Sequence, residues 1–279
     1  MNSALLSNGK VITAREYNAE IHGNRLYCID NSCKVPVIHV PESENTTTYF
    51  KTTGKNDSKH AAGCGFSKPL TFVESIKKVG EYQDDLLDNG ISETLVRLNL
   101  NKIDPDYERR LVEKDENEKK KTDPNKIKVK QESDTPASIG SLKSVVKLMT
   151  SYEPDILSGI IVNIKGKKIP ISSIIIDQEK AHNLLWNDRL IPNIGYFVYG
   201  EVENILRREK VIYINFKAVN KVLFSLVLFD KYFRHFTYSD MDLIGKNILA
   251  WGFLRKNTYQ DKNTTEMSIK ADAYIGILP

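Results

Sequence analysis

The stretch GYFVYGEV at residues 195–202 opens a run of short β-rich segments that continues with VIYINF at 211–216 and LIGKNILAWGFL at 243–254. Apolar and polar side chains alternate through these segments, which is typical of half-buried strands. The pattern predicts five strands, at 196–206, 211–217, 223–229, 247–256 and 267–278, and a short helical turn at 238–244. Closing such a set into a small β-barrel would remove its exposed edges.

This run resembles the OB-fold, over about 85 residues. The resemblance lies in Gly200-Glu201-Val202, Tyr213-Ile214-Asn215-Phe216, Phe224-Ser225-Leu226-Val227-Leu228, Gly245-Lys246 and Ala273-Tyr274-Ile275-Gly276-Ile277. It implies a binding site on the outer face of the second and third strands, together with the loops after the first and fourth strands.

The residues at these places have the chemistry of single-strand binding, in which bases stack on aromatic rings and cationic side chains contact phosphates. The candidate nucleic-acid-binding residues are Tyr199, Tyr213 and Asn215 on the strands, Arg207, Arg208 and Lys210 in the first loop, and Lys256, Tyr259 and Lys262 in the second. The alternatives are that the tyrosines are ordinary cross-strand packing pairs and the basic residues are solvated. Docking of a protein or of a small ligand on this face also stays open.

Charge is distributed unevenly along the chain. Residues 139–279 have a net charge of +5, whereas residues 1–103 are neutral and residues 104–138 have a net charge of −1. A polyanionic partner would fit this excess, as would a mixed-charge surface without such a partner. No apolar run is long enough to span a membrane, and the first residues lack the pattern of a secretory signal. We therefore expect a cytoplasmic protein without a membrane partner.

All three cysteines lie in the first quarter of the chain, at Cys28, Cys33 and Cys64. Together with His60 they form the pattern Cys-x4-Cys followed by His-x3-Cys. Three thiolates and one imidazole are the ligands of a closed structural zinc site, and an odd number of cysteines argues against a disulfide framework. We expect zinc as the cofactor, with unliganded thiols as the alternative. His22 and His39 are rivals for the fourth ligand position.

The N-terminal region also resembles the zinc-ribbon-like region of the CoiA-like competence proteins, over about residues 14–66. The shared features are a cysteine pair on a turn, β-rich sequence with the aromatic pair Tyr49-Phe50, and His-x3-Cys. In that family a histidine usually stands in place of Tyr49. The nuclease domain of these proteins has paired acids and a Glu-x-Lys pattern. The nearest approach here, in the stretch 177–180, has a different spacing, so no nuclease activity is carried over.

Residues 1–103 are predicted to be the zinc-binding module, with an amphipathic helix at 69–87 that packs on it and a short strand at 95–100. Residues 104–138 are rich in charge and poor in large apolar groups, which predicts a flexible linker. Residues 139–192 read as an α/β elaboration, with a helix at 141–152, a hairpin around 165–167 and a helix at 179–186. The barrel then occupies residues 193–279, and the whole chain belongs to the α+β class.

No constellation of catalytic residues is evident, so the sequence predicts a binding protein and not an enzyme. We expect it to bind single-stranded DNA or RNA in replication, recombination, DNA uptake, or mobile-element or defence biology. The alternative is an adaptor or accessory subunit of a larger nucleic-acid-processing or defence complex. The sequence does not define the oligomeric state.

Overall fold

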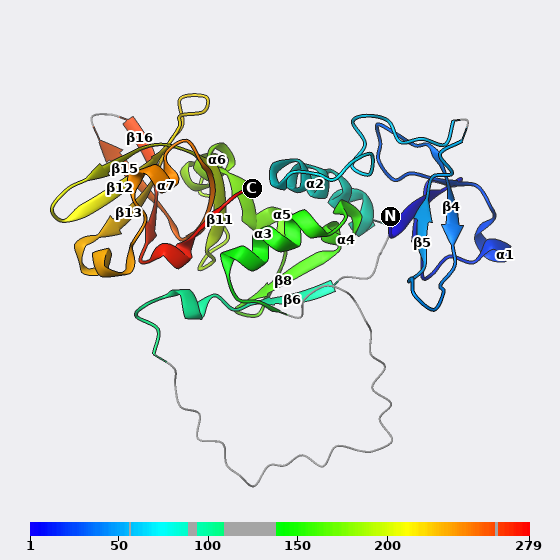
Figure 1. Cartoon of the computed structure of the whole chain (residues 1–279), viewed down its shortest axis with the longest axis horizontal. Helices are drawn as coiled ribbons and strands as arrows, with labels where there is room; N and C mark the ends of the chain where they lie inside the picture. The colour runs from blue at the N-terminus through cyan, green and yellow to red at the C-terminus, as the bar shows by residue number, and fades with distance from the viewer. Residues whose placement is uncertain (56, 89–93, 109–137, 260–261) are drawn as a thin grey trace, which may run out of the picture.

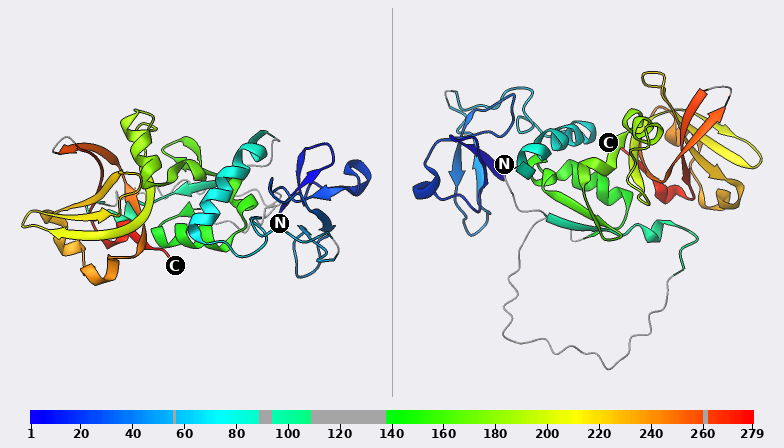
Figure 2. Two further views of the ribbon diagram at one scale, coloured as in Figure 1. Left: turned by 90° about the horizontal axis from the view of Figure 1, so that it is seen from above. Right: turned by 180° about the vertical axis from the view of Figure 1, so that it is seen from behind.

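The structure, a computed structural model, describes residues 1–55, 57–88, 94–108, 138–259 and 262–279, apart from the side chains of residues 84–88 and 259. Three parts follow one another along its long axis (Figure 1). They are a small β-rich module at the N-terminus, a layer of helices on a small sheet in the middle, and a strongly curled sheet that is mostly C-terminal (Figure 2). The α+β class is confirmed. No helix in the described part of the chain is long and apolar enough to cross a membrane.

The N-terminal module is an antiparallel sheet with the order β2-β1-β3-β4-β5. Its strands are β1 (Ser3–Leu6), β2 (Val11–Thr13), β3 (Leu26–Tyr27), β4 (Pro36–Val40) and β5 (Tyr49–Lys51), and a one-turn helix α1 (Ala19–His22) precedes β3. The β-rich sequence expected around the pair Tyr49-Phe50 is confirmed as β5. The first strand, β1, was not predicted, because SALL offers no alternation. The core of the module is small and includes Phe50, Leu26 and the sulfurs of Cys28 and Cys64.

The middle part is a four-stranded sheet with the order β7-β6-β8-β9 that is covered by short helices (Figure 1). Its strands are β6 (Thr94–Leu98), β7 (Ser138–Ile139), β8 (Ile160–Ile164) and β9 (Lys167–Pro170). Its helices are α2 (Phe72–Asp88), α3 (Leu142–Ser151), α4 (Pro154–Ser158) and α5 (Ile171–Ile174), and a 3-10 turn η1 (Asn101–Ile103) follows β6. The helices expected at 69–87 and 141–152 are confirmed as α2 and α3.

Helix α2 packs on the N-terminal module only at its far end. Tyr82 lies in a buried cluster with Val11 and Ile29 of that module. Phe72, Ile76 and Val79 belong instead to the same core as α3 and the curled sheet. The reason lies in the next strand, because β6 pairs in parallel with β8 and brings α2 onto α3, α4 and α5. A single sheet therefore joins residues on both sides of the predicted linker. Of that linker, residues 109–137 lie outside the described residues.

The C-terminal sheet has the order β15-β16-β13-β12-β11-β14-β17, and β10 adds to β11 in parallel. Its strands are β10 (Ile175–Asp177), β11 (Tyr196–Arg207), β12 (Val211–Phe216), β13 (Leu223–Phe229), β14 (Asn247–Gly252), β15 (Leu254–Tyr259), β16 (Lys262–Ile269) and β17 (Ile275–Ile277). The other elements are the helices α6 (Gln178–Trp186) and α7 (Asp240–Leu243) and the 3-10 turns η2 (Asp230–His235) and η3 (Asp272–Tyr274). Helix α6 confirms the helix expected at 179–186.

The curl of this sheet comes from β11, which changes partner along its length. Its first half pairs with β14 and its second half pairs with β12, and a register shift between Val202 and Asn204 lies at the start of the second pairing. Gly200 allows this bend, because a Cβ at that position would lie 2.4 Å from the ring of Phe216. The inward-facing residues Ile212, Ile214 and Phe216 are buried, as the alternation predicts.

The last predicted strand is the main difference between the expected and observed sheet. Residues 267–278 do not form one strand, because β16 ends at Ile269 and β17 begins at Ile275 with η3 between them. β16 pairs in parallel with β13, whereas β17 pairs with β14 on the opposite edge. The predicted fourth strand likewise divides at Phe253 into β14 and β15, which pair with β11 and β16, respectively.

Candidate metal centre and candidate nucleic-acid interface

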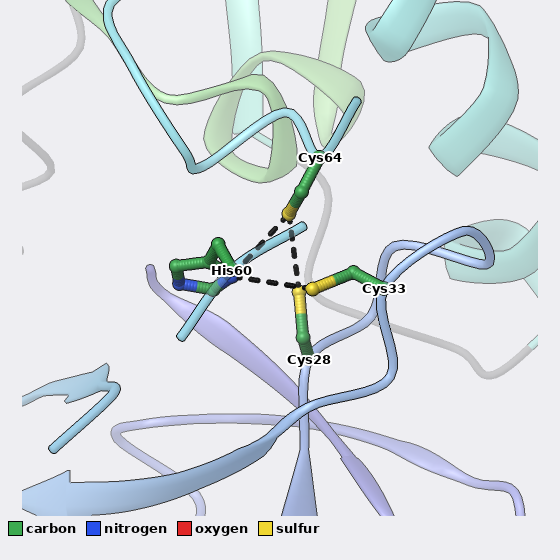
Figure 3. Close-up of side chains that lie close together, drawn as sticks. All are labelled: Cys28, Cys33, His60 and Cys64. Carbon is green, nitrogen blue, oxygen red and sulfur yellow. Dashed lines mark hydrogen bonds between the residues drawn. The ribbon is translucent and has the colours of Figure 1, made fainter. Parts of the chain in front are cut away.

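Two segments bring the three cysteines and His60 together. Cys28 follows β3, and Cys33 lies on a turn in which its amide donates to the carbonyl of Asp30 at 2.9 Å. His60 and Cys64 come from the loop between β5 and α2, where the Cys64 amide donates to the Ala61 carbonyl at 3.0 Å. The four side chains converge on one point (Figure 3).

The distances between the four side chains fit a tetrahedral metal site. The sulfurs of Cys28 and Cys64 are 3.6 Å apart, and Nδ1 of His60 is 3.5 Å from the sulfur of Cys33 and 3.3 Å from that of Cys64. All four ligand atoms lie within 4.8 Å of one another. A tetrahedral zinc ion with ordinary bond lengths separates its ligand atoms by about 3.5–3.8 Å. The cluster predicted from the sequence is therefore present and could hold a metal ion.

Hydrogen bonds prepare two of the sulfurs to act as ligands. The amides of Ala61 and Phe66 donate to the sulfurs of Cys33 and Cys64, each at 3.4 Å. The hydrogen bond from Cys28, helped by the Phe66 amide, lowers the pKa of Cys64 to about 6. The same bond and burial raise the pKa of Cys28. A thiolate is the form of cysteine that binds metal, so a lowered pKa at Cys64 favours ligation.

The two rival histidines lie elsewhere and make other contacts. Nδ1 of His22 accepts a hydrogen bond from the amide of Asn18 at 3.0 Å. Nε2 of His39 lies 2.6 Å from the hydroxyl of Thr48, and the ring of His39 packs against Tyr17. The geometry therefore selects His60 as the fourth ligand.

Asp30 is a buried residue of this centre that the sequence analysis did not single out. One of its oxygens accepts from the Tyr82 hydroxyl at 2.5 Å, from the Gly65 amide at 2.9 Å and from Lys78 at 3.0 Å. The other accepts from Ser32. Burial by itself would raise the pKa of Asp30, but the hydrogen bonds hold it well below its usual range. One carboxylate thus ties the cysteine turn to the second ligand segment and to α2.

On the curled sheet, the outer face of β12 carries Tyr213 and Asn215, as predicted. The guanidinium of Arg208 lies 6.0 Å from the centre of the Tyr213 ring. Asn215 belongs to a hydrogen-bonded row, because it accepts from Ser225 at 2.7 Å and donates to Asn204 at 2.8 Å. Arg208, Tyr213 and Asn215 therefore share one surface.

The same face has a second aromatic residue with an arginine beside it, which the sequence analysis missed. Phe229 on β13 pairs with Val211, and Val227 pairs with Tyr213, so Phe229 and Tyr213 are diagonal neighbours. The guanidinium of Arg255 lies 5.6 Å from the centre of the Phe229 ring. The alternation of side chains along β15 could have placed Arg255 on this face. It was missed because β16, the partner strand of β15, was not predicted as one strand.

Arg255 also neutralises a buried carboxylate. Its guanidinium contacts Glu266 at 2.6 Å, and the amide of Asn257 donates to the other oxygen of Glu266 at 2.6 Å. Only 3% of the Glu266 surface is exposed. Without Arg255, the charge of Glu266 would repel a polyanion. An anion can therefore bind to this face only while Glu266 is paired.

Two of the predicted binding residues are occupied elsewhere. Tyr199 is half-buried against Phe72 of α2, with the ring centroids 6.0 Å apart, and burial raises its pKa to about 12. Arg207 forms an ion pair with Asp240 at 2.8 Å and donates to the carbonyl of Tyr238. Neither joins Tyr213. The middle layer covers the Tyr199 face, which sequence periodicity by itself cannot reveal.

The remaining basic candidates are spread over the curled sheet. Lys256 forms an ion pair with Asp188 at 2.7 Å and lies over Trp186, at the end of the sheet covered by α6. Lys210 and Lys262 are exposed. The side chain of Tyr259 lies outside the described residues.

Comparison with models of protein families and with curated proteins gives no match for this chain. The resemblances to the CoiA-like proteins and to the OB-fold therefore stay predictions, and the proposals below are based on the geometry of the two regions.

Proposed function

We propose that this chain is a non-enzymatic binding protein whose C-terminal sheet is an OB-type barrel that binds single-stranded nucleic acid. The strand circuit supports the fold. β11, β12 and β13 follow one another, β13 pairs in parallel with β16, and β16 pairs with β15. β15 continues from β14, which returns to β11. With β14 and β15 counted as one continuous strand, this order matches the five-stranded Greek key of the OB-fold.

The observation that carries the function is the pair of aromatic rings on one face, each with an arginine beside it. Tyr213 with Arg208 and Phe229 with Arg255 lie on adjacent strands. A base can stack on such a ring, and the guanidinium of Arg208 can turn to a phosphate. Arg255 stays paired with Glu266 and keeps this face free of an unpaired acid. Each stacked base contributes about 1–3 kcal/mol without selecting a sequence. Both DNA and RNA strands fit this chemistry.

The Cys3His cluster is proposed to hold zinc as a structural ion. Its four protein ligands leave no position for a substrate, and a sulfur-rich tetrahedral set suits zinc. The surrounding core is too small to stabilise the module strongly without an ion. The zinc-stabilised module is then a second, separate unit of recognition beside the barrel.

The test is a binding titration of the full chain with labelled single-stranded DNA, single-stranded RNA and duplex DNA of equal length. We expect the single strands to bind more tightly than the duplex, with an affinity that falls steeply as salt rises. Absence of single-strand binding at low salt would contradict the proposal.

Variants locate the site. Phe229→Ala and Tyr213→Ala should each weaken single-strand binding about 5- to 100-fold through the loss of one stacked base. Phe253→Ala is the matched control, because Phe253 is also an exposed ring with a cation, Lys165, beside it, but it lies between β14 and β15 near the β8–β9 hairpin. Equal losses in Phe229→Ala and Phe253→Ala would remove this face as the site.

A protein-docking role is the second candidate, and exposed apolar residues near α7 favour it. Met241 is 90% exposed, and Leu206 and Ile244 are about half exposed. Exposed apolar surface of this kind is typical of interaction sites. Met241→Ser would then abolish capture of a partner without altering strand affinity, whereas unchanged capture would reject the role.

A further inference from the structure

Next to the proposed strand-binding face, the barrel holds a small cationic site that the chain itself fills. η2 follows Phe229 directly, and the amide of Asp230 donates to the carbonyl of Lys210. Nζ of Lys231, in this turn, lies 4.5 Å from the centre of the Tyr232 ring. Nζ of Lys270, which follows β16, lies 5.5 Å from the same centre. Two ammonium groups thus lie close to the ring of one tyrosine.

Two carboxylates from a distant segment occupy this site. Both oxygens of Asp104 contact Nζ of Lys270, at 2.8 and 2.9 Å, and an oxygen of Asp106 contacts it at 3.0 Å. The hydroxyl of Tyr232 donates to Asp106. The segment leaves β6 through η1, so its acids reach the barrel from the middle layer.

The contacts are those that a phosphate would make. An ammonium group and a phenolic hydroxyl donate to anionic oxygens, and the site is continuous with the aromatic face through Phe229. The pairing is also exposed enough to exchange, since the side chains of Lys270, Asp104 and Asp106 are 29%, 32% and 53% exposed. A partly exposed ion pair stays accessible to solvent, so a competing anion can reach it more easily than a buried pair.

We infer that Lys231, Tyr232 and Lys270 form a phosphate-binding site, and that Asp104 and Asp106 occupy it until a phosphate of a bound strand displaces them. That a nucleic-acid strand supplies the phosphate rests on the function proposed above, but the existence of the anion site does not depend on that function. The carboxylates act as an internal competitor, which lowers the affinity of the barrel for any polyanion.

The test compares the full chain with the double variant Asp104→Asn, Asp106→Asn, using inorganic tripolyphosphate and a labelled single strand as separate probes. The matched control is Glu42→Gln, Glu44→Gln, which removes two exposed acids at the same spacing from the N-terminal module. We expect the Asp104/Asp106 variant to bind tripolyphosphate about three- to tenfold more tightly than the control. Adding Lys270→Gln should abolish this gain. Equal affinities of the two double variants would overturn the site.

The strand probe separates the two proposals. If the Asp104/Asp106 variant also binds the single strand more tightly, the full inference is supported. If the strand binds but only the affinity for tripolyphosphate rises, the strand is rejected as the ligand of this site. Gain for tripolyphosphate with no strand binding in any variant supports the anion site and overturns only the proposed function. If the double variant does not fold, hydrogen exchange of the unaltered chain decides. Saturating tripolyphosphate should raise exchange at residues 101–108 and not at 42–44, and unchanged exchange at 101–108 would overturn the inference.

Discussion

In the N-terminal module the core is small and contains two of the three cysteines of the cluster, whereas the curled sheet and the middle layer share one continuous core that extends from Phe72 to Leu278. The module has short strands held by a cluster of polar and sulfur contacts. The curled sheet has longer strands whose buried side chains are mostly apolar. The difference fits the proposal that an ion maintains the first region, whereas packing maintains the second.

Removing the ligand cluster should give the largest effect. With metal bound, His60→Asn should unfold the module, because structural zinc sites contribute about 10 kcal/mol or more to folding. Hydrogen exchange should rise in β3 and β4 and stay unchanged in β12 and β13. His22→Asn is the control, since His22 lies outside the cluster. If elemental analysis found no metal in the unaltered protein, the proposal that an ion maintains the N-terminal module would be wrong.

The reverse experiment changes the barrel. Phe216→Ala should destabilise the barrel by about 3–5 kcal/mol, because Phe216 is fully buried against Phe224 and leaves a cavity. Metal content should not change. Loss of the metal in this variant would show that the two regions depend on one another for folding.

Asp30 links the two regions, so its replacement should affect both. Asp30→Asn should cost about 2–4 kcal/mol, because it leaves Lys78 without its buried partner and weakens the bonds to Gly65 and Tyr82. The depressed pKa means that this stability is present above the ordinary pKa of aspartate and is lost as the pH falls below it. We expect metal affinity to fall as well. Glu81→Gln, which removes the exposed partner of Lys78, should have little effect.

Asp155 of α4, which contacts the first residues of the N-terminal module, has the opposite pH dependence and the smallest expected effect on stability. It is buried and accepts from the amides of Asn2 and Ser3, and burial raises its pKa from 3.8 to about 6. The folded chain then binds the proton more tightly than the unfolded chain, so the contribution of Asp155 falls as the pH rises from 4 to 6. Urea titrations of Asp155→Asn should lack this fall, which is of order 2 kcal/mol. An identical pH profile would show that the carboxyl titrates normally.

Much of the secondary structure followed from local patterns. The strands β11 to β13 and the helices α2, α3 and α6 are close to their predicted positions, because alternation and helical periodicity are recorded in neighbouring residues. The division of residues 267–278 into β16 and β17 was not predictable in this way. It depends on two different partner strands that lie far away in the sequence.

The candidate sites divide in the same manner. Cysteine and histidine have few roles besides ligation when they occur in such spacing, so the four members of the cluster could be named in advance. Asp30 could not, because an aspartate in a turn is usually solvated and only the approach of Tyr82 and Gly65 buries it. Tyr199 and Tyr213 look alike in the sequence, yet Phe72 packs on the first and leaves the second at the outer face.

The amino-acid sequence by itself determined the α+β class, the cluster of three cysteines and His60, and the alternating strands β11 to β13, since each depends on residue type and short spacing. Only the tertiary structure decided which aromatic rings remain at the surface, which acids are buried and which lysines are paired. The physical reason is that burial and pairing depend on contacts between segments that are distant in the chain. The same contacts placed Phe229 and Arg255 beside Tyr213, and Asp104 on Lys270.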